Sequence, residues 1–459
     1  MTQAPRAVVV GGGIGGLTAA VALHRRGWRV TVLERARSLE PVGAGISLAP
    51  NALRALDVIG LGDEIRALAA WQGDGGLRAP GGRWLSRSDA AAVAGRFGGP
   101  LVLLHRATLI ACLAAQLPEG VVRTTSAAAL ADPGDADRPA RVSTSGGELE
   151  AELVVGADGI HSAVRRALFP RHPGPVYSGF TAWRVVVPLP GVDFASHETW
   201  GRGRIWGTHP MEDGRVYAYA AARVPAGGRA ADDERAELVR LFGDWHDPVP
   251  AVLAATRPGD VLRHDVHHLA EPLPAFHAGR VALLGDAAHA MPPTLGQGGN
   301  QAVEDAIVLA HHVDPRTVDP STAAPRTVDA ITAGASTGNR AGGDRLGAGL
   351  AAYTAARRPR TTAITRKAVG IARVNMMRSR PGTVLRDAAL TVLSKAGPAL
   401  FLRSFDTIAD WRPPRSPYAS DGTGASDGTG VRVPRTVPCH PASPRPTPPQ
   451  IRVPRRRSP

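Results

Sequence analysis

Short apolar runs and one stretch of helical periodicity open the chain. Residues 6–10 (RAVVV) predict a buried strand, Leu17 to Leu23 predict a helix, and Val30 to Leu33 predict a second strand. This order is typical of a βαβ unit, in which a helix joins two parallel strands. Similar buried strands are predicted at residues 153–156 and 281–284.

Between about 176 and 270 the pattern changes. Thr181–Val187 and Val216–Ala220 are alternating or β-branched runs that contain aromatic residues, which predicts a mostly antiparallel sheet. Residues 350–405 are helical in pattern. We therefore expect an α/β fold with an inserted, mostly antiparallel β domain and C-terminal helices.

Three further helices are indicated. Residues 43–60 predict a loop that runs into a helix, with Pro50 near the start of the helix and Gly60 after its end, because Pro is favoured at the first helical position and Gly after the last. A second runs from Leu109 to Leu117. A third starts near Gly299 and carries Val303, Ile307 and Ala310 on one face.

Two segments differ in composition from the rest. Residues 314–349 contain no aromatic residue, and residues 412–459 are rich in Pro, Arg, Gly and Ser. The tail holds nine Arg and two Asp, so half of the net charge of +14 lies in a segment that we do not expect to fold. This favours a solvated basic tail over a nucleic-acid-binding arm.

The rest of the composition excludes several classes of protein. Two cysteines are too few for a disulfide framework, a Cys-based zinc site or an iron–sulfur cluster, and we expect no metal. The uncharged run at residues 7–23 is slightly short for a membrane span and contains five Gly. We expect a cytoplasmic protein without a membrane span, of 43% hydrophobic content.

The glycine-rich run at residues 11–16 matches G-x-G-x-x-G through Gly11, Gly13 and Gly16. Gly at these positions permits a tight turn, a close approach of the backbone to a pyrophosphate, and close helix–strand packing. Glu34 ends the second predicted strand, where a carboxylate accepts hydrogen bonds from ribose hydroxyls. The alternative is an ordinary Gly-rich turn.

Two aspartates follow buried strands. Asp158 lies in GADGIHSAVR (156–165), and Asp286 is the second residue of GDAAHAMPP (285–293), which leads into LGQGGN (295–300). Ligands of open α/β sheets bind at the carboxyl ends of the strands, although either Asp alone is also a plausible helix cap.

Taken together in this order, the three motifs resemble those of the flavin-dependent aromatic hydroxylases, the family of para-hydroxybenzoate hydroxylase and salicylate hydroxylase. The similarity covers residues 6 to about 313 and 350 to about 405. Further matches are residues 43–46 with 50–52, His105-Arg106, residues 179–184 and residues 357–360.

The resemblance implies a Rossmann-like FAD-binding domain. Glu34 would hold the adenosine ribose, Arg106 the FAD phosphates or ribose, and Asp286 the ribityl chain or pyrophosphate. Asp158 would serve FAD and the passing nicotinamide nucleotide, and the backbone of residues 295–300 would lie against the isoalloxazine. The full set of expected cofactor-binding residues is Gly11, Gly13, Ile14, Gly15, Gly16, Glu34, Gly45, Arg106, Asp158, Gly285, Asp286, Pro293, Gly296, Gly298, Gly299 and Asn300.

The resemblance also implies a monooxygenase that uses NAD(P)H and dioxygen to hydroxylate an aromatic or polycyclic small molecule through a flavin C(4a)-hydroperoxide. Expected partners are the aromatic substrate and dioxygen, without nucleic acid, in a monomer or homodimer. A flavin reductase or dehydrogenase of the same fold, and a non-catalytic flavin-binding protein, remain as alternatives.

The substrate pocket is expected where the 176–270 sheet covers the flavin. Arg184 is the expected catalytic polar group, and a structural ion pair is its alternative role. The aromatic candidates are Trp183, Trp200, Trp206, Tyr217 and Tyr219, of which strand alternation would turn only about half inward. His289 is expected to be a structural hydrogen-bonding residue.

The predicted domain organisation follows from these patterns. Three parts form the FAD-binding domain, two form the substrate domain, and three C-terminal segments complete the chain. The FAD-binding parts are 1–75, 101–175 and 273–313; the substrate-domain parts are 76–100 and 176–272; then follow a low-complexity loop (314–349), C-terminal helices (350–411) and a disordered basic tail (412–459).

Overall fold

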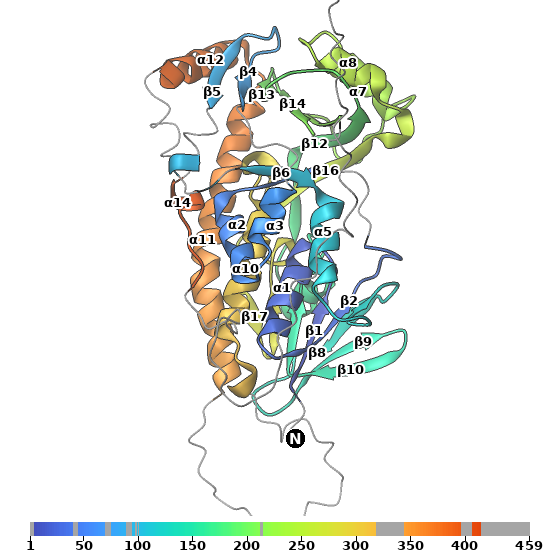
Figure 1. Ribbon diagram of the computed structural model, residues 1–459, viewed down its shortest axis with the longest axis vertical. Coiled ribbons are helices and arrows are strands. Elements are labelled where there is room, and N and C mark those ends of the chain that lie inside the picture. Colours follow the sequence, from blue (N-terminus) through green and yellow to red (C-terminus); the bar gives the residue numbers. More distant parts are fainter. Residues whose placement is uncertain are drawn as a thin grey trace, which may run out of the picture.

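The computed structural model describes residues 4–39, 45–68, 75–88, 94–96, 99, 101–211, 214–317, 344–395 and 406–414. A six-stranded sheet forms the base of the molecule (Figure 1). Its order is β17 (His277–Ala278), β18 (Val281–Leu283), β11 (Leu153–Gly156), β1 (Arg6–Val10), β2 (Arg29–Leu33) and β7 (Val122–Arg123). All neighbours are parallel except β17, which pairs antiparallel with β18 at one edge. The strands predicted from the apolar runs are all present.

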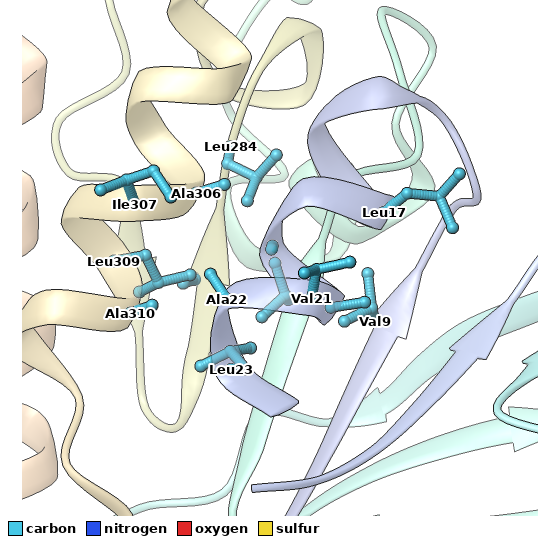
Figure 2. Close-up of a cluster of buried hydrophobic side chains, with 14 of the residues drawn as sticks. Val9, Leu17, Val21, Ala22, Leu23, Leu284, Ala306, Ile307, Leu309 and Ala310 are labelled. Atoms are coloured by element: carbon cyan, nitrogen blue, oxygen red, sulfur yellow. The ribbon is translucent and has the colours of Figure 1, made fainter. Parts of the chain in front are cut away.

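Helices cover this sheet and bury its apolar residues. They are α1 (Ile14–Arg25), α2 (Pro50–Val58), α3 (Gly62–Ala67), α5 (Arg106–Ala115), α6 (Ala163–Leu168), α9 (Asp286–His289) and α10 (Gly298–His312). In Figure 2, side chains of β1 and α1 meet Ile307 and Leu309 of α10. α1 follows the first strand of this sheet along the chain, and α10 follows the last. Because the two helices pack together in one core, they hold in place the Gly-rich turns that precede them.

A seven-stranded sheet lies above the first (Figure 1). Its order is β16 (Leu262–Leu269), β12 (Pro175–Pro188), β15 (Arg215–Ala222), β14 (Arg204–Pro210), β13 (Ser196–Trp200), β4 (Gly75–Arg78) and β5 (Trp84–Ser88). Only the β13–β4 pair is parallel. Helices α7 (Glu234–Phe242) and α8 (Val249–Ala255) cover one face, and neither helix was predicted from the sequence.

The remaining strands form two small sheets. One has the order β10 (Gly147–Ala151), β9 (Ala140–Thr144) and β8 (Ala128–Asp132), and the other pairs β3 (Gly45–Leu48) with β6 (Val102–His105). A loop was predicted where β3 lies, which is wrong. The strand exists because it pairs antiparallel with β6, a partner far away in the sequence. Short 3₁₀ turns occur at Pro258–Asp260, Pro293–Leu295 and Pro315–Thr317.

The C-terminal helices are α11 (Arg345–Asn375), α12 (Arg380–Lys395) and α14 (Asp406–Ala409). Helix α11 runs along the whole molecule, from the first sheet to the second (Figure 1). It starts earlier than the predicted residue 350 because the Asp344 carboxylate caps it by accepting a hydrogen bond from the Gly347 amide at 2.9 Å. Most of the predicted low-complexity loop and basic tail lies outside the described residues.

In the described part of the chain, no helix combines the length and apolar character that crossing a membrane requires. The same part contains no cluster of three His, Cys, Asp or Glu side chains suited to a metal ion.

Candidate flavin site

The Gly-rich turn between β1 and α1 depends on the absence of side chains. Gly11 has a φ of +109°, and a Cβ there would lie 2.3 Å from the Ala157 carbonyl oxygen. A Cβ on Gly16 would lie 2.0 Å from the Gly11 carbonyl oxygen. At Gly13, which precedes α1, no protein atom lies within 4 Å of a Cβ position. The turn is therefore tight against the protein at Gly11 and Gly16 and open at Gly13.

Glu34 lies against this turn. Its carboxylate accepts hydrogen bonds from the Gly12 amide at 2.7 Å and the Ala36 amide at 2.8 Å. A carboxylate has about four acceptor positions, so two amides leave capacity for ribose hydroxyls. The geometry fits the predicted role of Glu34.

Asp158 follows β11, and its two carboxylate oxygens differ in their hydrogen bonding. Oδ2 accepts hydrogen bonds from the Ala163 amide at 2.7 Å and the Val164 amide at 3.1 Å, so Asp158 does cap α6. Oδ1 is buried and has no hydrogen-bond partner in the described part of the chain. A buried acceptor without a partner is costly, which makes Oδ1 a fitting acceptor for a donor group on FAD or a nicotinamide nucleotide.

Asp286 opens α9 directly after Gly285, whose φ is +59°. Its side chain is exposed to solvent, yet burial raises the pKa of its carboxyl, against the opposing charges of His289, Arg106 and Arg165. The Asp286 carboxylate lies beside the start of α10, where a Cβ on Gly298 would lie 3.7 Å from Asp286 Oδ1.

Arg106 opens α5. Burial lowers the pKa of its guanidinium, while the Asp286 charge raises it and the Arg184 charge lowers it. The charges of Asp286 and of Arg184 on β12 therefore both lie within electrostatic range of Arg106, although the three side chains come from α5, α9 and β12.

The turn before α10 exposes its backbone. Pro293 and Gly296 are exposed, Gly298 and Gly299 are half-buried, and Gly296 has a φ of +61°. The Asn300 side chain forms hydrogen bonds with other parts of the protein. It accepts a hydrogen bond from the Ala49 amide at 2.8 Å and donates one to the Ser47 carbonyl at 2.9 Å. Asn300 therefore attaches β3 to α10, and only its backbone is left for the predicted flavin contact.

Three more of the predicted glycines, Gly45, Gly299 and Gly15, face protein rather than open space. A Cβ on Gly45 would lie 2.7 Å from the Tyr217 ring, and one on Gly299 would lie 3.0 Å from Ile46 Cδ1. Gly15 likewise packs against Leu284. These glycines permit close packing, and their predicted cofactor contacts stay predictions.

Strand alternation divides the aromatic candidates between the two faces of the seven-stranded sheet. Trp183 and Trp206 point into the core beneath α7 and α8, away from the first sheet. Trp200, Tyr217 and Tyr219 lie on the opposite face. Arg184 lies there too and hydrogen-bonds Tyr217, which differs from the structural ion pair that was its alternative role.

Sequence reasoning missed Glu198 and His209 on this face. Glu198 accepts a hydrogen bond from the Trp200 indole at 3.0 Å, and His209 Nδ1 lies 2.5 Å from Ser196 Oγ. Two sequence signals pointed to them. Glu198 lies two positions before Trp200, and Gly207 interrupts a strand, which often marks a close approach by another group.

His289 has the structural role that was predicted. Its Nε2 lies 2.5 Å from Asp305 Oδ2, and the same oxygen accepts a hydrogen bond from the Gly285 amide at 2.9 Å. Arg357 Nε donates to the other Asp305 oxygen at 2.6 Å. These attractions hold the pKa of the Asp305 carboxyl at about 2 despite the opposing effect of burial. A buried network thus holds the turn that carries Asp286.

An Asp286→Ala variant is expected to retain FAD less well. The loss of a charge-assisted hydrogen bond at this position should raise the dissociation constant of FAD by roughly tenfold to a hundredfold. The measurement is FAD content after gel filtration, followed by titration of the stripped protein. Asp63→Ala on α3, whose carboxylate is fully exposed, is the control. A variant that holds FAD as tightly as the parent would remove Asp286 from the site.

The comparisons with known proteins agree with this geometry. The family described as "FAD binding domain" matches residues 5–313. The chain is 39% identical over 307 residues to the aurachin C monooxygenase/isomerase of Stigmatella aurantiaca, covering 66% of this chain and 79% of that protein. It is 36% identical over 333 residues to the 3-amino-4-hydroxybenzoate 2-monooxygenase of Streptomyces cremeus, covering 68% and 79%.

A solved structure of Klebsiella pneumoniae HpxO, complexed with FAD and uric acid, superposes with a TM-score of 0.75 at 27% identity, over 89% of this chain and 98% of that one. The family match spans both the Gly-rich turn and the turn that carries Asp286. The resemblance drawn from the three motifs is therefore confirmed, and the chain belongs to the FAD binding domain family of FAD-dependent aromatic monooxygenases.

Proposed function

We propose that this FAD-dependent, NAD(P)H-using monooxygenase hydroxylates an aromatic or polycyclic small molecule held between the FAD and the Arg184 face of the seven-stranded sheet. The observation that carries this proposal is the position of Arg106, on which the charges of both Asp286 and Arg184 act. It joins the turn expected to hold FAD to a sheet face lined with aromatic side chains. Relatives named as acting on 3-amino-4-hydroxybenzoate and on urate support an aromatic substrate.

The two large sheets support the predicted division of the chain. The FAD-binding domain would comprise 1–75, 101–175 and 273–313, which contain the strands of the six-stranded sheet. The substrate domain would comprise 76–100 and 176–272, which contain the seven-stranded sheet except Gly75 of β4 and Pro175 of β12. Cytoplasmic location and a monomeric or homodimeric state remain predictions.

The residues of the candidate site would bind the cofactor and the substrate and exclude water, while FAD supplies the oxygen chemistry. Bound FAD, once reduced by NAD(P)H, supplies the activation of dioxygen and the transfer of one oxygen atom. The amides at the start of α10 offer partial positive charge to the flavin ring. Asp158 Oδ1 accepts a hydrogen bond from a nucleotide. Arg184 forms an ion pair with a negatively charged group of the substrate. The sheet face excludes water, so that oxygen is transferred to the ring of the substrate.

The function is tested by a panel of aromatic compounds screened for stimulation of NAD(P)H oxidation. The true substrate should accelerate oxidation at least about tenfold, or ~1.4 kcal/mol of barrier, because reduction without substrate wastes NAD(P)H as hydrogen peroxide. Labelled dioxygen should place one oxygen atom in the product. Anaerobic stopped-flow reduction with and without substrate separates control of reduction from control of the oxygen step.

Two other outcomes would favour the alternatives. Turnover without incorporation of label would favour a reductase or dehydrogenase. Full FAD occupancy without turnover of any aromatic compound would favour a flavin-binding protein whose basic tail recruits a partner.

A further inference from the structure

One row of residues crosses four strands of the seven-stranded sheet. Arg184 of β12 pairs with Tyr219 of β15, Tyr219 pairs with Gly207 of β14, and Gly207 pairs with Glu198 of β13. Directly paired residues of antiparallel strands point to the same face. The row therefore presents a cation, a phenol and a carboxylate in line, with a gap at Gly207, on the face proposed to hold the substrate.

Gly207 leaves room for the Tyr219 ring. A Cβ at Gly207 would lie 2.3 Å from the ring carbon that bears the hydroxyl, so the ring lies across the backbone of β14. This directs the Tyr219 hydroxyl toward the Glu198 carboxylate on the next strand, where the two groups interact. Glu198 also accepts the Trp200 indole N–H at 3.0 Å, which fixes its side chain.

The two groups are partly exposed. Tyr219 and Glu198 are half-buried, yet burial is the largest cause that raises both pKa values, to about 6 for Glu198 and well above the usual value for Tyr219. Near pH 7, Glu198 is thus mainly ionised and Tyr219 is protonated. Because an ionised carboxylate only accepts, the Tyr219 proton points toward Glu198. The lone pairs of the phenolic oxygen remain available to accept a hydrogen bond from a ligand.

The neighbouring titratable groups do not alter this assignment. His209 of β14 stacks on Tyr219 with ring centroids 5.5 Å apart, and burial lowers its pKa to about 4, so it is neutral near pH 7. Tyr217 of β15 is buried and hydrogen-bonds Arg184 of β12. From α12, the Arg386 guanidinium is occupied by the Trp200 and Gly201 carbonyls.

We propose that Tyr219, oriented by Glu198 across Gly207, is a hydrogen-bond acceptor that selects substrates carrying a ring hydroxyl or ring N–H group. The inference rests on the proposed function in placing the substrate on this face. Glu198 is then a positioning residue, since it fixes the direction of the Tyr219 O–H. An ether or any group that only accepts would meet lone pairs and be rejected.

The test uses the FAD-loaded protein and two matched pairs of probes: 2-naphthol with 2-methoxynaphthalene, and 3-amino-4-hydroxybenzoate with its 4-methoxy ether. Dissociation constants come from the change in the visible absorbance of oxidised FAD, so no turnover is needed. At pH 7.5 or so, the hydroxyl probe of each pair should bind at least about tenfold more tightly than its ether.

Three variants report on the row. Tyr219→Phe removes the acceptor, and Gly207→Ala moves the ring, so both should reduce the ratio to about twofold or less. Glu198→Gln should do the same, because an amide N–H donates to Tyr219 and turns its O–H toward the ligand. Tyr177→Phe, which removes a hydroxyl bonded to the Val224 carbonyl at 2.6 Å, is the matched control and should leave the ratio unchanged.

The pH dependence separates positioning from mere structural support. For the naphthol pair, which stays neutral below pH ~9 as other phenols do, the ratio should fall as the pH drops through about 6, where Glu198 gains its proton. Glu198→Gln should give a ratio that does not vary with pH. A ratio that stays tenfold in Glu198→Gln, or that ignores pH in the parent, would overturn the inference.

The two proposals fail separately. Equal binding of hydroxyl and ether probes, or no binding of any probe by FAD-loaded protein, contradicts the role of Tyr219 even if some aromatic compound is hydroxylated. The expected ratio in a protein that never inserts labelled oxygen supports the role of Tyr219 and contradicts the proposed function.

Discussion

Gly16→Ala is expected to yield protein without FAD and with reduced stability. The added methyl would lie 2.0 Å from the Gly11 carbonyl oxygen and 3.1 Å from its carbon, and both atoms belong to the backbone. Neither can move without shifting the turn between β1 and α1. Overpacking of this kind costs about 1–3 kcal/mol or more. The displaced turn would also withdraw the amides that face the pyrophosphate.

Gly13→Ala is the matched comparison, three residues earlier in the same turn. Its methyl would meet no protein atom within 4 Å, and its backbone at φ −74° suits alanine. We expect the parent's thermal stability without FAD, but weaker FAD binding, because Gly13 faces the space assigned to the pyrophosphate. The measurements are FAD content and thermal unfolding of the stripped proteins. Full FAD occupancy in Gly16→Ala would contradict the assignment of this turn to the cofactor.

The first sheet could be predicted from sequence because its central strands are buried on both faces. Val8 to Val10 and Leu153 to Val155 are fully or almost fully buried, so every position is apolar and the strand is visible as a continuous run. β3 lacks this signal. It has four residues, GISL, of which only Leu48 is buried, and its existence depends on pairing with β6.

The flavin side of the site was equally accessible to sequence reasoning. Asp158 and Asp286 stand directly after strands, and parallel strands that end together bring such residues to one edge of the sheet. The substrate side was harder, because alternation gives the period of a strand and not which face is inward. That choice is made by α7 and α8, which cover Trp183 and Trp206 and were not predicted.

Glu198 and Gly207 illustrate a second limit. Their significance depends on register across β13, β14 and β15, and one residue of slip would move each side chain to the opposite face. A sequence shows each strand separately. Only the assembled sheet shows that a glycine on one strand lies between a tyrosine and a carboxylate on its neighbours.

Arg357→Met is expected to destabilise the protein by about 3–5 kcal/mol. Arg357 is 1% exposed, and its guanidinium pairs with Glu304 and, at 2.6 Å, with Asp305, both of which are fully buried. Methionine fills a similar volume but removes the guanidinium. The remaining ion-pair partner of Asp305 is then His289, and that of Glu304 is Arg360. The cost arises because two buried carboxylates lose a compensating charge. Urea unfolding of the parent and variant measures it.

Arg240→Met is the control, because Arg240 also pairs with two acids, Asp232 and Glu237, but about half of its side chain is exposed. Screening by water weakens such an exposed pair, so we expect Arg240→Met to cost much less than Arg357→Met. If Arg357→Met cost no more than Arg240→Met, the buried network would have no special role in stability.

The sign of the pH dependence identifies the cause. In the parent, Asp305 has a depressed pKa of about 2, so its contribution to stability is present above its ordinary pKa of 3.8 and is lost as the pH falls through about 2. Without Arg357, less positive charge opposes the effect of burial, and we expect the folded-state pKa of Asp305 to rise above its ordinary value of 3.8. The difference in unfolding free energy between parent and variant should therefore shrink as the pH is lowered from 7 toward 4. Because Asp305 also holds the Gly285 amide at 2.9 Å, FAD retention should fall together with stability.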